Sequence, residues 1–140
     1  MSTAYESATL LIRLYELRRD PTMREARTWY FQNFNPTSVD EVVETLGGPN
    51  SAHFRMVTSY WDMAASFVNH GAIDPEMFND ANGEHIFVYL KLEPYLAEYR
   101  AKIGNPAYLK NLEQLLLTSP SVKDRVEALR DRVRAMVAGR

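Results

Sequence analysis

The chain has 140 residues, of which 46% are hydrophobic, 24% are charged and 11% are aromatic, and its formal net charge is -2. These proportions are those of a globular protein and exclude a mainly disordered chain. The chain has no cysteine, which excludes a disulfide framework, a zinc ribbon, an iron–sulfur site and a cysteine nucleophile. The length suits one domain with an ordinary core, which we expect to cover residues 1–140.

Targeting signals are absent from the sequence. The start, Met-Ser-Thr-Ala-Tyr-Glu, lacks the basic residues, apolar run and cleavage site of a signal peptide. Every apolar stretch is far shorter than the roughly 20 residues that span a bilayer. We therefore expect a cytoplasmic protein with no transmembrane segment. We also expect no cofactor.

Charge is distributed unevenly along the chain. Residues 1–34 contain five basic and four acidic side chains, residues 35–99 contain two and ten, and residues 100–140 contain nine and four. Two explanations remain open. Either the acidic middle packs beside the basic ends within the chain, or the basic C-terminal part meets an acidic partner.

Helix signals occur throughout the chain. Asp20, Asp74, Asn105 and Ser119 each precede a proline, which is the pattern of an N-cap followed by proline in the first helical position. Apolar residues recur with a period near 3.6 and nowhere alternate as in a strand. The predicted helices cover residues 3–19, 21–34, 39–46, 51–70, 84–103, 106–118 and 120–137, with a short piece after Pro75.

Further residues mark the ends of these helices. Gly71, Gly83 and Gly104 lie where left-handed C-caps would end a helix. Ser38 and Glu41 have the spacing of a capping box.

These elements predict an all-α fold, a single compact bundle of about five long and two short helices. The aromatic helices 51–70 and 84–103 should form its centre, and Pro94 should kink the second of them. In the second helix, Trp29 or Tyr30 should face the core. In the first helix, the spacing places inward Ala8, Leu11, Ile12 and Tyr15, with Leu14 as a further candidate.

Histidine and carboxylate side chains gather around one predicted loop. His70, Asp74 and His85 lie near helix ends that could meet, so they are metal-ligand candidates, although each also suits an ordinary helix end. Neither the Glu-x-x-His nor the His-Glu-x-x-His spacing occurs. The same region is our candidate for a small-ligand pocket, lined by Trp61, His70, Tyr89 and Tyr95.

Other polar residues have competing interpretations. Asp62, beside Trp61, either is buried with a perturbed pKa or faces water. A basic patch of Arg18, Arg19, Arg24 and Arg27 could bind nucleic acid, but acidic residues interrupt it and make nucleic acid an unfavoured partner.

The last predicted helix, 120–137, has a regular apolar seam. The seam residues are spaced 4, 3, 4 and 3, as in a coiled coil, and are Val122, Val126, Leu129, Val133 and Met136. Two heptads are too short for an autonomous coiled coil. The seam therefore either docks on the chain's own core or forms an interface with another molecule.

Three segments carry a resemblance to a known family. They are Arg19–Arg27, which contains Asp-Pro-Thr-Met-Arg-Glu-Ala-Arg, Phe67–Glu76, which contains His-Gly-Ala-Ile-Asp, and Leu92–Arg100, which contains Pro-Tyr-Leu-Ala-Glu-Tyr-Arg and is followed by Tyr108–Glu113. They resemble segments of a bacterial family of uncharacterised all-helical proteins, a domain of unknown function. The resemblance runs from Arg19 to about Leu116. It implies an all-α fold, and it implies no activity, cofactor or catalytic residue.

The sequence favours a non-enzymatic interaction or regulatory module that self-associates or binds a protein partner. The apolar seam and the lack of any catalytic motif favour this hypothesis. One alternative is a helical protein or enzyme that binds a small ligand or a metal. A second alternative is a nucleic-acid-binding regulator.

Overall fold

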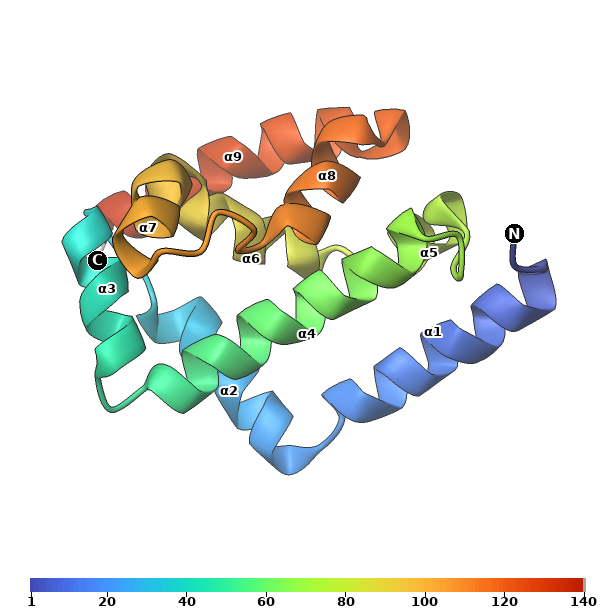
Figure 1. The fold of residues 1–140 in the computed structure, drawn as a ribbon, viewed down its shortest axis with the longest axis horizontal. Coiled ribbons are helices and arrows are strands. Elements are labelled where there is room, and N and C mark those ends of the chain that lie inside the picture. Colours follow the sequence, from blue (N-terminus) through green and yellow to red (C-terminus); the bar gives the residue numbers. More distant parts are fainter. Residues whose placement is uncertain (140) are drawn as a thin grey trace.

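A computed structural model describes residues 1–139 and shows a bundle of α-helices with no strand in that range, which confirms the predicted all-α class (Figure 1). No helix in this range is both long and apolar enough to cross a membrane. The elements, in chain order, are α1 (Ala4–Arg18), α2 (Pro21–Asn33), α3 (Val39–Gly47), α4 (Ser51–Asn69), α5 (Pro75–Ala81), α6 (Glu84–Leu92), η1 (Glu93–Tyr95), α7 (Leu96–Ile103), α8 (Lys110–Thr118), η2 (Pro120–Val122) and α9 (Lys123–Ala138), where η denotes a 3-10 helix.

The longest helix, α4, lies at the centre of the bundle. It has 19 residues and packs against α2 and α8. Its predicted inward stripe, which includes Phe54, Val57 and Trp61, is buried. The second predicted central helix, α6, has seven of its nine residues buried. A helix buried on all sides belongs to the interior of a domain. The two aromatic helices therefore form the core, as predicted.

Pro94 interrupts the predicted helix 84–103 completely. α6 ends at Leu92, one 3-10 turn follows, and α7 begins at Leu96. Proline has no amide for the helical hydrogen bond, and its ring clashes with the preceding turn. The second part, α7, ends at Ile103. Its C-cap, Gly104, takes the predicted left-handed conformation with φ 68°.

Two of the four predicted proline starts are confirmed. The carboxylates of Asp20 and Asp74 accept hydrogen bonds from amides in the first turns of α2 and α5. Asn105 instead closes a short turn by accepting from the amide two residues on, and α8 begins later than predicted, at Lys110. Ser119 precedes a 3-10 turn that leads into α9.

Two predicted caps differ from expectation. Gly83 precedes α6 as its N-cap with φ -139°, so it is not a left-handed C-cap. The Ser38 hydroxyl accepts from the Glu41 amide at 3.2 Å, as a capping box requires. The Glu41 carboxylate, however, accepts from the Thr37 amide at 2.8 Å and from its hydroxyl at 3.2 Å, one residue before the expected position.

A side chain from another helix caps α8. Its own N-cap residue, Leu109, has a φ of 55° and makes no side-chain cap bond. The Asp62 carboxylate from α4 accepts hydrogen bonds from the Leu112 amide at 3.0 Å and from the Asn111 side chain at 3.1 Å. A carboxylate there satisfies an otherwise unpaired amide and suits the helix dipole. Asp62 therefore has a structural role that neither predicted interpretation described.

A buried ammonium group closes the C-terminal end of α2. Lys91 is 1% exposed, and its Nζ donates to the backbone carbonyls of Tyr30, Phe31 and Phe34 at 2.8, 3.1 and 2.9 Å. Burial lowers the pKa of Lys91 to about 8, so the group is charged at neutral pH. All three protons have an acceptor, and the cation lies at the negative end of the helix dipole.

The acidic middle and the basic ends of the chain pair with one another. Arg27 lies 2.9 Å from the carboxylate of Glu84, and Arg130 makes two hydrogen bonds to Glu93 at 2.9 and 3.0 Å. These pairs join the first and last parts of the chain to the acidic middle. The intramolecular explanation of the uneven charge therefore holds for these groups.

Candidate functional site

The side chains predicted to line one pocket lie in different surroundings. Tyr95 donates to a backbone carbonyl of the loop before α3 at 3.2 Å, and Tyr89 lies 3.4 Å from a carboxylate of α8. His70 is exposed at the end of α4, where its Nδ1 lies 2.8 Å from a carbonyl of the preceding turn. Trp61 contacts one of the metal-ligand candidates, His85, with the ring centroids 5.5 Å apart. The structure thus separates this predicted set.

His85 is buried between two aromatic rings. Its ring centroid lies 5.5 Å from that of Trp61 and 5.0 Å from that of Phe78. Neither ring nitrogen has a hydrogen-bond partner within residues 1–139. Burial, with smaller contributions from Arg125 and Arg18, lowers the pKa of His85 from 6.5 to about 3. The imidazole is therefore neutral at pH 7.

The metal-ligand candidates do not converge. His85 lies in the core, His70 is exposed, and the Asp74 carboxylate accepts from an amide in the first turn of α5 at 2.9 Å. Within the described residues, no three or more histidine, aspartate or glutamate side chains are grouped as a metal site requires. Capping and burial thus account for these three residues.

Two arginines of the predicted basic patch point into the molecule. The carboxylate of Glu84 accepts from Arg27 Nε at 2.9 Å and from Trp61 Nε1 at 3.2 Å. The Arg18 guanidinium lies over the Trp61 ring at 5.3 Å. The other two arginines of the patch are exposed. Because the four do not share one surface, they do not present the continuous positive face that phosphate binding needs.

The apolar seam of α9 faces the chain's own core. The helix packs along α6, and Val122, Val126 and Val133 are 0%, 8% and 4% exposed. Leu129 is half-buried against the core, and Met136 is exposed. Burial within a single chain removes the three valines from the predicted interface. Of the two predicted alternatives, the first therefore holds for these valines: the seam docks on the chain's own core.

A different helix, α1, presents an apolar stripe to solvent. Leu14 is buried, but Ile12 and Tyr15, which were predicted to face inward, are 59% and 54% exposed. Tyr5 is 83% exposed, and Ala8 lies between it and Ile12 on the same side of the helix. We call these four residues, which are spaced 3, 4 and 3, the outer face of α1.

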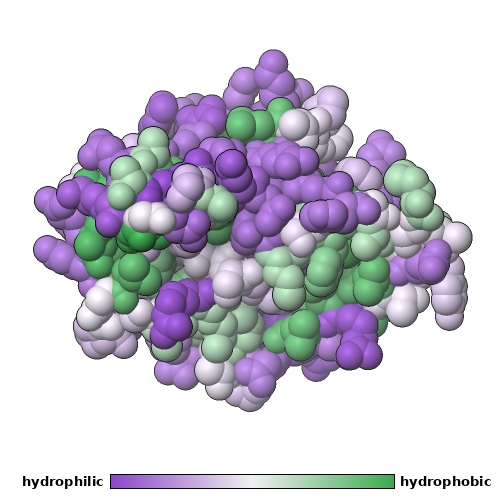
Figure 2. Space-filling model, in the orientation of Figure 1, coloured by the Kyte–Doolittle hydropathy of each residue, from purple (hydrophilic) through white to green (hydrophobic). Residues whose placement is uncertain are grey.

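The outer face lies at the edge of the molecule. α1 runs along that edge, with its N-terminal end beside α5 and its C-terminal end beside α2 (Figure 1). Apolar side chains gather over the region of α1 and α4 in the space-filling view (Figure 2). The guanidinium groups of Arg18 and Arg19 lie 5.5 and 5.9 Å from the centre of the Tyr15 ring. These cation–π contacts favour one position of an exposed ring.

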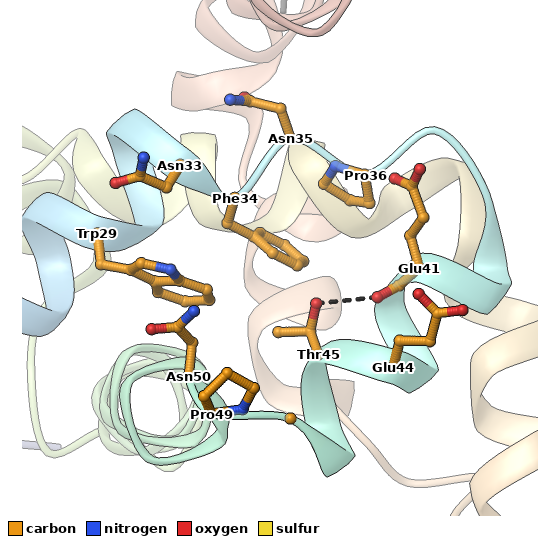
Figure 3. Close-up of a pocket in the computed structure, with 11 residues that line it drawn as sticks. Trp29, Asn33, Phe34, Asn35, Pro36, Glu41, Glu44, Thr45, Pro49 and Asn50 are labelled. Atoms are coloured by element: carbon orange, nitrogen blue, oxygen red, sulfur yellow. Dashed lines mark hydrogen bonds between the residues drawn. The ribbon is translucent and has the colours of Figure 1, made fainter.

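A separate polar pocket lies between the end of α2, the face of α3 and the turn before α4 (Figure 3). Its volume is about 420 Å³. We call it the Trp29 pocket. The side chains that give it its character are Trp29, Asn33, Glu41, Glu44, Thr45 and Asn50.

Neighbouring groups hold the two sides of this pocket in place. The Trp29 ring packs against Phe34 at 5.6 Å and against His53 at 6.1 Å between centroids. On the opposite side, the hydrogen bonds from Thr37 orient the Glu41 carboxylate. The pocket therefore pairs a fixed aromatic wall with a carboxylate of defined direction.

The fold and its surfaces define an all-α domain with an exposed helix face and a polar pocket. A family model described as "Domain of unknown function (DUF4760)" matches residues 3–119, so the chain belongs to this family. The match covers both α1 and the Trp29 pocket and ends before α9. No curated protein matches the chain. No solved structure matches it.

Reasoning from the sequence missed both of these surfaces. In α1, the bundle-facing stripe keeps Leu11 and Leu14 of the prediction and adds Leu10, whereas the predicted Ile12 and Tyr15 face solvent. The sequence did contain a signal for the exposed face. A helix with apolar residues on two sides leaves one side exposed when the other packs on the bundle. Between Trp29 and Tyr30, the structure buries Tyr30 and leaves Trp29 half-buried in the pocket wall.

Proposed function

We propose that the protein is a non-enzymatic interaction module that forms a homodimer through the outer face of α1. One observation carries this proposal: Tyr5, Ile12 and Tyr15 are exposed together on a helix whose other side is packed on the bundle. A helix that is apolar on two sides is normally covered on both. Clustered exposed apolar side chains mark interaction sites more often than scattered ones do.

The spacing of this face suits a partner helix. Residues spaced 3, 4 and 3 form the seam along which two helices pack, with side chains of one helix between those of the other. Tyrosine is enriched in the centres of protein interfaces because it provides a large contact area at a low cost in entropy. The two arginines beside Tyr15 reduce that cost further by favouring one ring position.

A second copy in antiparallel orientation fits the charges at the two ends of α1. Beside its first turns lies α5, which carries Glu76 and Asp80 and no basic residue. At its other end, Arg19 and Arg24 are exposed, with the exposed Asp20 and Glu25 beside them. A two-fold axis across the middle of α1 brings Glu76 and Asp80 of one copy toward Arg19 and Arg24 of the other. In this register Tyr5 of one copy lies against Tyr15 of the other.

The mass in solution tests this proposal. Light scattering should give the mass of a dimer for the unmodified chain and of a monomer for Ile12→Glu. Loss of an isoleucine side chain that is buried in the dimer interface costs about 1.5–3 kcal/mol of association free energy. The two-fold axis applies this loss twice, which weakens the dimer by about 100-fold to 10,000-fold.

A matched control compares the outer face with an exposed apolar side chain elsewhere on the surface. Leu117 is 70% exposed on α8, away from the outer face, so Leu117→Glu should leave the dimer intact. Both variants should keep the unfolding midpoint of the monomer, because neither side chain is in the core. A monomeric unmodified chain at its highest soluble concentration would refute the proposal, as would an Ile12→Glu variant that remains dimeric.

A further inference from the structure

We propose that the Trp29 pocket binds a small organic cation, an alkylammonium or alkylguanidinium compound, between the Trp29 ring and the carboxylates of α3. This goes beyond self-association, because the pocket lies on α2, α3 and the turn before α4 and shares no residue with the outer face of α1. The pocket's volume of about 420 Å³ is in the range of small-ligand sites.

The aromatic wall provides the first part of the recognition. Trp29 is half-buried, and its ring is fixed by tilted contacts with Phe34 and His53. Its indole faces the pocket (Figure 3). Among aromatic side chains, indole binds organic cations most strongly through its face. A ring already held by its neighbours loses little further entropy when a ligand binds.

The carboxylates provide the second part. Glu41 and Glu44 lie on the side of α3 that lines the pocket, and Glu41 is oriented by two hydrogen bonds from Thr37. Among the described residues that line the pocket there is no lysine, arginine or histidine. The described lining therefore includes two acidic side chains and an aromatic wall opposite, which suits a cation with an aliphatic body and disfavours an anion.

Asn50 adds a polar group at the floor of the pocket. It is the N-cap residue of α4, a position where asparagine usually bonds to the first turn, yet it makes no side-chain cap bond. Its amide instead points toward the pocket beneath Trp29 (Figure 3). Such a group can accept a hydrogen bond from an ammonium or guanidinium N–H.

Binding can be tested with agmatine, which carries both an ammonium and a guanidinium group. Tryptophan fluorescence should change saturably with agmatine and should not change with equal concentrations of 1-butanol, a neutral compound with an aliphatic body. Trp29→Phe should abolish the change, because the other tryptophan, Trp61, is 1% exposed and lies in the core. An equal response to 1-butanol, or no saturable response to agmatine, would refute the proposal.

Two glutamine variants test the role of charge. Glu44→Gln should weaken agmatine binding about two- to fivefold, the effect of losing one exposed charged contact. Glu127→Gln, an exposed substitution on α9 outside the pocket, should leave the affinity unchanged. Equal affinities for the two variants would overturn the assignment of the pocket.

A final comparison identifies the natural source of the cation. Tighter binding of agmatine than of acetyl-arginine amide assigns the pocket to a free amine, and the reverse assigns it to an arginine side chain of a peptide. The Ile12→Glu variant should bind agmatine as the unmodified chain does. Failure of the ligand proposal and failure of the dimer proposal are therefore distinguishable.

Discussion

The stability of the protein should fall as the pH drops below about 6.5, because His85 cannot accept a proton in the folded state. The pKa of its imidazole is 6.5 in an exposed setting and about 3 in the core. Between these values the unfolded chain binds one proton that the folded chain does not. Stability is therefore complete above about pH 6.5 and declines as the pH falls toward 3.

The magnitude follows from the width of this window. Each pH unit below 6.5 costs about 1.4 kcal/mol, so His85 alone should remove about 2 kcal/mol of stability between pH 7 and pH 5. The cause is physical: charging the ring would place an imidazolium between Trp61 and Phe78, with no hydrogen-bond partner in the described chain and with Arg125 nearby.

Urea unfolding of the unmodified chain and of His85→Phe, each at pH 7 and pH 5, measures this effect. Phenylalanine keeps an aromatic ring in the site and cannot be charged. His85→Phe should lose about 2 kcal/mol less than the unmodified chain on acidification. The control His70→Gln removes an exposed imidazole and should keep the full loss. Equal losses for the unmodified chain and His85→Phe would refute the reasoning.

Two further predictions concern groups that hold helix ends in place. Lys91→Met should lower the free energy of unfolding at neutral pH by about 3 kcal/mol, because it leaves three carbonyls at the end of α2 without a donor. A loss below about 1 kcal/mol would contradict the role of the ammonium. Asp62→Ala should cost about 1–2 kcal/mol and should raise amide hydrogen exchange most in the first turn of α8; uniform exchange across α4 and α8 would argue against a capping role.

Local signals in the sequence were sufficient for most of the fold. Asp20 and Asp74 start helices because a capping oxygen and a following proline act within one turn. Pro94 breaks its helix for an equally local reason. Asn105 has the same pattern as Asp20 and yet closes a turn, and α8 begins later, where Asp62, distant in the sequence, caps it. No local pattern records such a contact.

The candidate sites depended on longer-range information. In α1, either of two apolar stripes could face the bundle, and periodicity could not decide between Leu14 and Ile12. The residues that line the Trp29 pocket all lie between Trp29 and Asn50, but the way α2, α3 and the start of α4 pack together is set by the fold and not by helix periodicity. Conversely, His70 and His85 are close in sequence, but one is exposed and the other lies in the core.

The central claim, an antiparallel dimer through the outer face of α1, can be tested most directly by disulfide cross-linking. The chain has no cysteine, so introduced cysteines report only on the positions chosen. Mild oxidation of Tyr5→Cys mixed with Tyr15→Cys should give a cross-linked dimer of the two variants, while Tyr5→Cys alone and Leu117→Cys alone should remain largely uncross-linked. Cross-linking of Tyr5→Cys to itself as efficiently as to Tyr15→Cys would contradict the antiparallel arrangement. No cross-link in the mixture would contradict the dimer.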